Sequence, residues 1–193
     1  MRRTGLVGVL AIAVVVGACT SEEDFTVPAT GVHEAYVARV VDALAEAHVE
    51  TLRLVEDERE VTAEVQARLA ATFAPEEALR RADGLRNVLA QDLEGFPGSR
   101  GAPSRRVQGL LDADGDCVLA EVEVAFPVVE DPAAGEDAAP GQEPPVPGGG
   151  QGAGRPVVVE LRRAAVDEAV NPTGWVIARE ELVTGPAPER GCG

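Results

Sequence analysis

The side chains that could do chemistry in this chain are few and widely spaced. His48 falls on the apolar stripe of a predicted helix, where an imidazole could act as a general base or a pH sensor. Tyr36 and Trp175 are the single tyrosine and the single tryptophan, and each could line a ligand pocket. The commoner roles are a hydrogen-bonded core histidine and aromatic rings at the core boundary. We therefore take Tyr36, His48 and Trp175 as pocket candidates and assign no catalytic residue.

One segment has the alternating carboxylates of a calcium loop. Residues 112–116 read DADGD, and Glu123 stands at the twelfth position, where such a loop has its bidentate glutamate. The sixth position requires glycine but holds Cys117, and the flanking residues predict strands. A solvent-exposed hairpin turn is the preferred interpretation, and calcium binding is the alternative. His33 and His48 lack the spacing of metal ligands, so we expect no metal and no cofactor.

The N-terminus has the three parts of a secretory signal. Two arginines precede an apolar run over residues 6–16, which is shorter than the roughly 20 residues that cross a bilayer. Residues 16–19, Val-Gly-Ala-Cys, resemble the lipobox of bacterial lipoproteins. The resemblance implies that residues 1–18 are a signal peptide, that Cys19 carries a lipid anchor, and that the protein is held at the extracytoplasmic face of the cell membrane. An ordinary signal peptide that contains a cysteine by chance is the alternative.

Two cysteines remain once Cys19 is assigned to the lipid. Cys117 and Cys192 are then an even pair in an oxidising compartment, which predicts a disulfide between them. Closing a loop of that length would stabilise the fold by roughly 4 kcal/mol in the chain-entropy model. Two independent free thiols are the alternative.

The charge of the chain argues against one class of partner. There are 33 acidic and 17 basic residues, all of the latter arginine, and the formal net charge is −16. Nucleic-acid affinity depends mostly on neutralising phosphates, so a nucleic-acid partner is not expected. The negative charge favours solubility and discourages self-association.

Helical periodicity covers the first half of the predicted mature chain. From Val32 to Val55 apolar residues recur at helical spacing, and Thr30 is a suitable N-cap. The charged segment 56–60 predicts a bend or an end, although one long helix is an alternative. A second apolar stripe covers residues 61–73, and a third helix begins near Pro75 and ends at Gly95. The predicted buried face of the third helix consists of Leu79, Ala82, Leu85, Leu89 and Leu93.

The hydrophobic period then changes to that of strands. Strands are predicted over residues 107–111, 118–126, 157–161 and 175–183, with turns at 112–116 and 171–174. Residues 127–156 separate the second strand from the third and hold seven prolines and seven glycines. This composition predicts a long disordered insertion within one domain, because the later strands complete a sheet that needs the earlier ones.

Helices followed by antiparallel strands, ending in a Gly174-Trp175 strand, resemble the nuclear-transport-factor-2-like cone fold, also called SnoaL-like or ketosteroid-isomerase-like. The resemblance implies an α+β fold in which N-terminal helices pack on a curved antiparallel sheet of about four strands. Members use such a cone for small-molecule binding, for isomerase-type chemistry or for dimerisation. The isomerase branch implies a pocket aspartate and a tyrosine donor, and no residue here is matched to either role.

The predicted organisation is a signal peptide at 1–18, a flexible tether at 19–30, one α+β domain at 31–184 and a tail at 185–193. The predicted function is a non-catalytic, lipid-anchored envelope module that binds a small apolar ligand or a partner protein. The alternatives are an isomerase or cyclase that uses His48 or a buried acid, and a structural dimerisation module.

Overall fold

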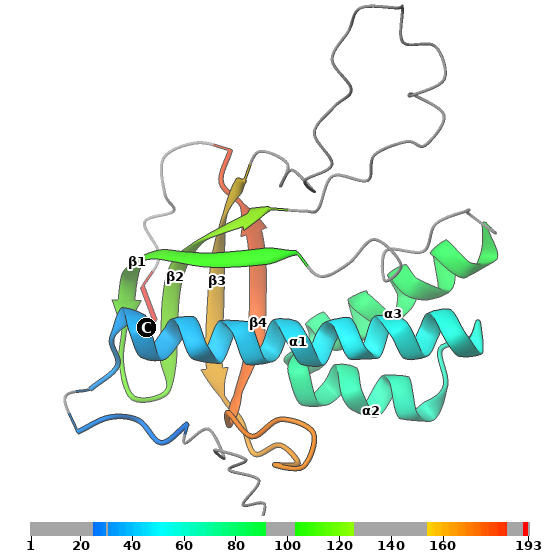
Figure 1. Cartoon of the computed structure of the whole chain (residues 1–193), viewed down its shortest axis with the longest axis horizontal. Coiled ribbons are helices and arrows are strands. Elements are labelled where there is room, and N and C mark those ends of the chain that lie inside the picture. The colour runs from blue at the N-terminus through cyan, green and yellow to red at the C-terminus, as the bar shows by residue number, and fades with distance from the viewer. Residues whose placement is uncertain (1–24, 30, 92–102, 126–153, 185–190, 193) are drawn as a thin grey trace, which may run out of the picture.

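The protein is described by a computed structural model that covers residues 25–29, 31–91, 103–125, 154–184 and 191–192. This part of the chain forms three helices followed by four strands, with the bounds α1 Glu34–Glu58, α2 Ala63–Thr72, α3 Pro75–Ala90, β1 Ser104–Ala113, β2 Cys117–Ala125, β3 Arg155–Arg163 and β4 Trp175–Leu182. The sheet order is β1-β2-β3-β4, and each neighbouring pair is antiparallel. In Figure 1, α1 crosses the strands, while α2 and α3 lie at the β4 side. The predicted α+β class, with helices packed against a four-stranded antiparallel sheet, is confirmed.

Helix α1 begins and ends at local signals rather than at glycine or proline. Its N-cap is His33, not the predicted Thr30, and the His33 Nδ1 atom accepts a hydrogen bond from the Tyr36 amide at 3.3 Å. At the other end Arg59 has a left-handed backbone with φ of 55°, and its amide donates to the Val55 carbonyl. The predicted break near residues 56–60 is therefore confirmed, and α1 and α2 are separate helices.

The second and third helices follow the predicted order, and Ala82, Leu85 and Leu89 of the predicted buried face of α3 do pack in or against the core. Thr62 caps α2, and Pro75 occupies the first turn of α3 as expected. Leu79 was predicted to be buried but is 66% exposed. Glu77 is turned inward instead, because two arginines hold its carboxylate, as described below. The buried face of α3 consists of Glu77, Ala78, Ala82 and Leu85.

Strands β1, β2 and β3 begin earlier than predicted, whereas β4 begins at Trp175 as predicted. Strand β1 begins at Ser104, three residues before the predicted strand, and β3 begins at Arg155, inside the segment predicted as a disordered insertion. The β1–β2 connection is the expected hairpin. Its turn is held by the Asp114 side chain, which accepts hydrogen bonds from the amides of Asp116 at 2.8 Å and Cys117 at 2.7 Å. This carboxylate therefore serves the turn.

The core lies between the helices and one face of the sheet, and it extends further toward the N-terminus than predicted. Phe25 is buried in this core, and its carbonyl accepts a hydrogen bond from the Tyr36 hydroxyl at 2.9 Å. The packed unit therefore includes residues that were assigned to the flexible tether at 19–30. The sheet residues that face the helices in the core cluster are Val118, Ala120, Val122, Val124, Val157, Val159, Leu161, Trp175 and Ile177.

The C-terminal segment is fixed to the sheet by the predicted cysteine pair. Cys117 and Cys192 form a disulfide, and the Cys192 amide donates to the Asp112 carboxylate at 2.8 Å. Cys117 alternates with core-facing Val118 on β2, so the disulfide lies on the sheet face away from the helices.

Several predictions concern segments that lie outside the described residues. These are the signal peptide at 1–18, the lipid anchor Cys19, the cap Thr30, the end of α3 at Leu93 and Gly95, Phe126, residues 127–153 of the insertion, and residues 185–190 and 193 of the tail. None of the helices in the described part of the chain combines the length and the apolar character that a membrane crossing needs.

Candidate functional site

Two of the three predicted pocket residues meet in the core. The Trp175 indole Nε1 donates to the Tyr36 hydroxyl at 2.8 Å, and that hydroxyl donates to the Phe25 carbonyl. Trp175 is 0% exposed, and the Arg163 guanidinium covers its ring at 4.6 Å. Each polar atom of this pair thus has a partner, and the pair joins α1 to β4 and to the N-terminal segment.

The turn before β4 supports the Trp175 side of this core. The Asn171 amide nitrogen donates to the carbonyls of Ala71 at 2.6 Å and Trp175 at 2.7 Å, and its oxygen accepts from the Thr173 amide at 3.0 Å. Gly174 follows with φ of 65°, a conformation that favours glycine. The predicted turn at 171–174 is therefore buried, and its hydrogen bonds link α2 to β4.

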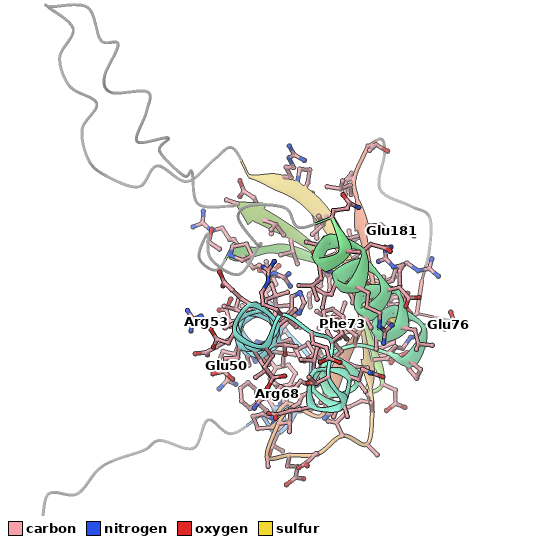
Figure 2. The ribbon with its side chains drawn as sticks, turned by 90° about the vertical axis from the view of Figure 1, so that its right-hand side faces the viewer. Glu50, Arg53, Arg68, Phe73, Glu76 and Glu181 are labelled. Atoms are coloured by element: carbon pink, nitrogen blue, oxygen red, sulfur yellow. A yellow bond between two sulfur atoms is a disulfide. The ribbon has the colours of Figure 1, made fainter. Side chains whose placement is uncertain are left out.

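His48, the third predicted pocket residue, lies elsewhere. It is twelve residues after Tyr36 on the same helix, which corresponds to about 18 Å along the axis. Its ring meets the Phe73 ring edge-to-face at a centroid distance of 5.0 Å. The His48 Nδ1 atom is buried and has no hydrogen-bond partner among the described residues. Figure 2, viewed from the end of the molecule where α1 finishes, shows Phe73 between the three helices.

A cluster of charged side chains adjoins His48 and Phe73. The Arg81 guanidinium lies 4.9 Å from the Phe73 ring centroid and binds the carboxylates of Glu77 at 2.7 Å and Glu180 at 2.9 Å. Arg105 of β1 approaches the same Glu180, but its Nη2 atom is 3.7 Å from the carboxylate. The cluster therefore joins α3 to both edge strands of the sheet.

Arg105 is the least satisfied member of this cluster. Its side chain is only 6% exposed. Its Nε and Nη1 atoms are buried and have no hydrogen-bond partner among the described residues. A buried guanidinium normally bonds with most of its donors, since an unpaired buried charge is costly. Arg105 is therefore the side chain in the described structure that most needs an additional partner.

Burial and like charge change the protonation of both His48 and Arg105. Burial, followed by the positive charges of Arg81 and Arg105, lowers the pKa of His48 to about 3. Burial also lowers the pKa of Arg105, an effect that Glu180 opposes, Arg81 reinforces and Asp42 opposes. At neutral pH His48 is therefore neutral, and arginine stays protonated because its ordinary pKa is so high.

A pocket of about 400 Å³ opens between α1 and the start of β1, and Arg105 forms part of its wall. The pocket is lined by Asp42, Ala45, Glu46, Val49, Glu50, Arg53, Pro103, Ser104 and Arg105. Figure 2 shows Glu50 and Arg53 on α1, away from α3. Five of these residues are charged, but apolar atoms contribute as much of the pocket surface as polar ones, and none of the three pocket residues predicted from the sequence lines it.

Arg105 was not identified from the sequence as a candidate site residue. The alternation of inward-facing and outward-facing residues along the strand already indicated that Arg105 is buried. Arg105 has the same parity as Val107, which packs against the core, whereas Arg106 is exposed and points to the other face. The predicted strand began at Val107, so this parity was not applied to Arg105.

The arrangement combines an under-satisfied buried cation, a neutral histidine and a charged pocket wall. Among the described residues no group of three or more histidine, cysteine or acidic side chains could hold a metal ion. The carboxylate of Glu123, the twelfth position of the calcium-like pattern, instead accepts a hydrogen bond from Gln108 at 2.6 Å. No protein-family model, curated protein or solved structure matches this chain.

Proposed function

We propose that this protein is a lipid-anchored envelope module that binds a small polar ligand in the pocket between α1 and β1, without catalysing a reaction on it. One observation carries this proposal. Arg105 is almost fully buried at the wall of a pocket of about 400 Å³ while two of its three guanidinium nitrogens have no partner in the described structure. A pocket of this size falls in the range of small-molecule sites.

The fold gains little from the charge of Arg105. Glu180 is already bound by Arg81 at 2.9 Å, whereas its distance to Arg105 is 3.7 Å. Burying a charge without good hydrogen bonds costs several kcal/mol, and an apolar side chain of similar size is often at least as stable. A ligand anion in the pocket would offset part of that cost through its attraction to the Arg105 charge, and it would bind the buried Nε and Nη1 donors once the side chain turned toward the pocket.

The geometry favours binding over catalysis by His48. A general base works best when its pKa is near the working pH, and the pKa of His48 is lowered to about 3. The Nδ1 atom of His48 is buried, its ring packs edge-to-face on Phe73, and His48 does not line the described pocket. The charged lining also favours a polar ligand over the apolar one predicted from the sequence.

We also propose that the sheet is curved into a cone and that the protein is anchored in the cell membrane. The approach of Arg105 and Glu180, which stand on opposite edge strands, supports a curved, cone-like sheet of the nuclear-transport-factor-2-like kind. The Val-Gly-Ala-Cys sequence at 16–19 supports a lipid on Cys19 and a position at the extracytoplasmic face. Replacing Cys19 with alanine should release the protein from the membrane fraction or leave it unprocessed, and unchanged lipid labelling would contradict the anchor.

Ligand binding is tested by thermal-shift screening of a small-molecule panel that contains anions, cations, zwitterions and apolar compounds. At least one polar compound should raise the melting temperature of the wild type but not of Arg105→Gln. Arg106→Gln is the matched control, because it removes the same charge one residue away on the exposed face of β1. If no compound has an effect that depends on Arg105, the proposed function is wrong.

A further inference from the structure

We infer that the Arg105 side chain has two positions, the buried one of this structure and one turned into the pocket, and that protonation of His48 drives it from the first to the second. The inference deepens the proposed function, because it describes how acid would regulate the donors that the same pocket presents to a ligand. It rests on the proposed function only for that consequence, since the movement itself is measured without a ligand.

Arg105 is held loosely in its buried position. Its Nη2 atom lies 3.7 Å from the Glu180 carboxylate, which is longer than a hydrogen bond, whereas Arg81 binds the same carboxylate at 2.9 Å. Its Nε and Nη1 atoms have almost no accessible surface and no hydrogen-bond partner in the described part of the chain. These two atoms therefore lose no hydrogen bond when the side chain leaves, and the burial of unpaired donors ends.

The pocket provides the space for the second position. Arg105 lines this cavity of about 400 Å³, which is far larger than a guanidinium group. Its backbone is paired with Val124 of β2, so only side-chain torsions need to change, and these move between staggered positions. Because the buried donors have almost no accessible surface, a ligand in the pocket reaches them only after this turn.

The α1 wall of the pocket would receive the turned guanidinium. It carries three acids, Asp42, Glu46 and Glu50, and one arginine, Arg53, so its net charge is negative. Glu50 also pairs with Arg68 at 3.8 Å, and Asp42 already acts on Arg105 in its present position. Glu46 is exposed and is the expected partner of Arg105 in the turned position.

His48 supplies the drive for the movement. Its Nδ1 atom is buried without a hydrogen-bond partner among the described residues, and its ring packs edge-to-face on Phe73. The charged groups around His48 and Arg105 are Asp42 on α1, Glu77 and Arg81 on α3, and Glu180 on β4. A protonated His48 would be the third positive charge of this cluster, beside Arg81 and Arg105, against two carboxylates on α3 and β4.

Arg105 is the cation that can leave. Arg81 binds Glu77 at 2.7 Å and Glu180 at 2.9 Å, and its guanidinium covers the Phe73 ring at 4.9 Å, so it is fixed. When Arg105 turns away, water can enter the space that it occupied. Burial, the first cause of the lowered pKa of His48, is then relieved, and the repulsion by Arg105, the last cause, ends.

The direction of the pH dependence follows from these two causes. The turned form binds a proton on His48 more tightly than the buried form does, so it gains population as the pH falls below the ordinary imidazole pKa of 6.5. The gain is at most about tenfold per pH unit. The ratio of turned to buried Arg105 therefore rises by up to about 100-fold between about pH 7.5 and about pH 4.5.

The test is NMR of the full mature chain with a soluble gadolinium chelate, which broadens the signals of protons that solvent reaches. The Arg105 Cδ protons should be broadened little at about pH 7.5 and strongly at about pH 4.5. Arg106 is the internal control, because it is exposed one residue away on β1 and should be broadened at both pH values. Core protons of Val122, which is fully buried, should stay protected at both, which shows that the fold persists.

Two histidine variants test the link to His48. His48→Leu removes the proton site, so Arg105 should stay protected at both pH values, although every other titrating group is unchanged. His33→Asn removes the other histidine, keeps a side chain suited to the N-cap of α1, and should respond to acid as the wild type does. In the wild type the broadening must also follow the titration of the His48 ring signals, which tests the link even where His48→Leu fails to fold.

A pocket variant tests where the side chain goes. Glu46→Gln should reduce the broadening of Arg105 in acid, because it removes the expected partner in the turned position. Its exposed position keeps the effect on folding small. Broadening that is unchanged in Glu46→Gln would contradict the assigned destination of Arg105.

The outcomes separate this inference from the proposed function. Arg105 that stays protected in acid while His48 titrates, or equal broadening in the wild type and in His48→Leu, overturns the inference. The proposed function survives that result if a compound of the thermal-shift panel still depends on Arg105. If Arg105 moves as expected but no compound depends on it, the inference holds and the proposed function is wrong. Where both hold, that compound should bind more tightly in acid.

Discussion

Replacing His48 with leucine is expected to make the protein more resistant to acid. His48 has a folded-state pKa of about 3, whereas an imidazole in the unfolded chain has the ordinary value of 6.5. Between these two pH values the unfolded state binds a proton that the folded state excludes. The stability of the wild type therefore falls as the pH drops below 6.5, by about 1.4 kcal/mol per pH unit from this residue alone.

The loss of folding stability at about pH 5 follows from the difference between the two pKa values of His48. At about pH 5 the proton on His48 costs the folded state about 2 kcal/mol, because it would be buried beside Arg81 and Arg105. Above pH 6.5 the cost disappears, since both states are neutral there. Leucine cannot bind a proton, so His48→Leu should lose about 2 kcal/mol less stability than the wild type between about pH 7.5 and about pH 5.

The assay is urea unfolding followed by the fluorescence of Trp175 at both pH values. The difference between the two proteins isolates His48, because all other titrating groups are common to both. The slope of the unfolding free energy against urea should stay the same, which shows that the folded and unfolded states have not changed otherwise. Equal losses of stability in the wild type and in His48→Leu would refute the burial of an uncharged His48 beside two arginines.

Three further predictions concern the fold. Tyr36→Phe should destabilise the protein by about 1 to 3 kcal/mol in urea unfolding, because it leaves the Trp175 indole and the Phe25 carbonyl without their partner. A smaller change would show that water replaces the hydroxyl. Arg59→Gly should raise the stability by about 0.5 to 1 kcal/mol in the same assay, since φ of 55° is strained for arginine. A loss of stability would mean that the contacts of the Arg59 side chain contribute more than the backbone strain costs. Cys192→Ser should lower the stability by about 4 kcal/mol under oxidising conditions, since it opens a closed loop with a sequence separation of 75 residues. Under reducing conditions it should have no effect. Equal effects in both conditions would contradict the disulfide.

The order and type of the secondary-structure elements could be predicted from periodicity alone. The three helical stripes and the change to strand alternation each depend on residues close in sequence, and the hairpin depends on the turn chemistry around Asp114. The break after α1 was also visible, although its actual mechanism is a left-handed Arg59 that charge composition does not reveal.

The candidate site could not be predicted, because it depends on contacts between distant segments. Arg105 is significant only because Glu180, far along the chain, is already bound by Arg81 and leaves its donors free. The burial of Glu77 in place of Leu79 has a local origin instead, since ion pairs with Arg80 and Arg81, three and four residues away on the same helix, let the carboxylate face inward. Tyr36 and Trp175 were predicted as pocket residues but are buried in the core, and their hydrogen bond to each other depends on the packing of α1 against β4.

The most direct test is the unfolding free energy of Arg105→Met, measured beside the wild type and the control Arg106→Met. The central claim is that the charge of Arg105 is kept for a ligand and not for the fold. Methionine has similar length and no charge, so we expect Arg105→Met to be as stable as the wild type or more stable, because Arg81 continues to hold Glu180. A loss of about 3 kcal/mol or more would contradict the claim, since it would identify Arg105 as a structural ion-pair partner.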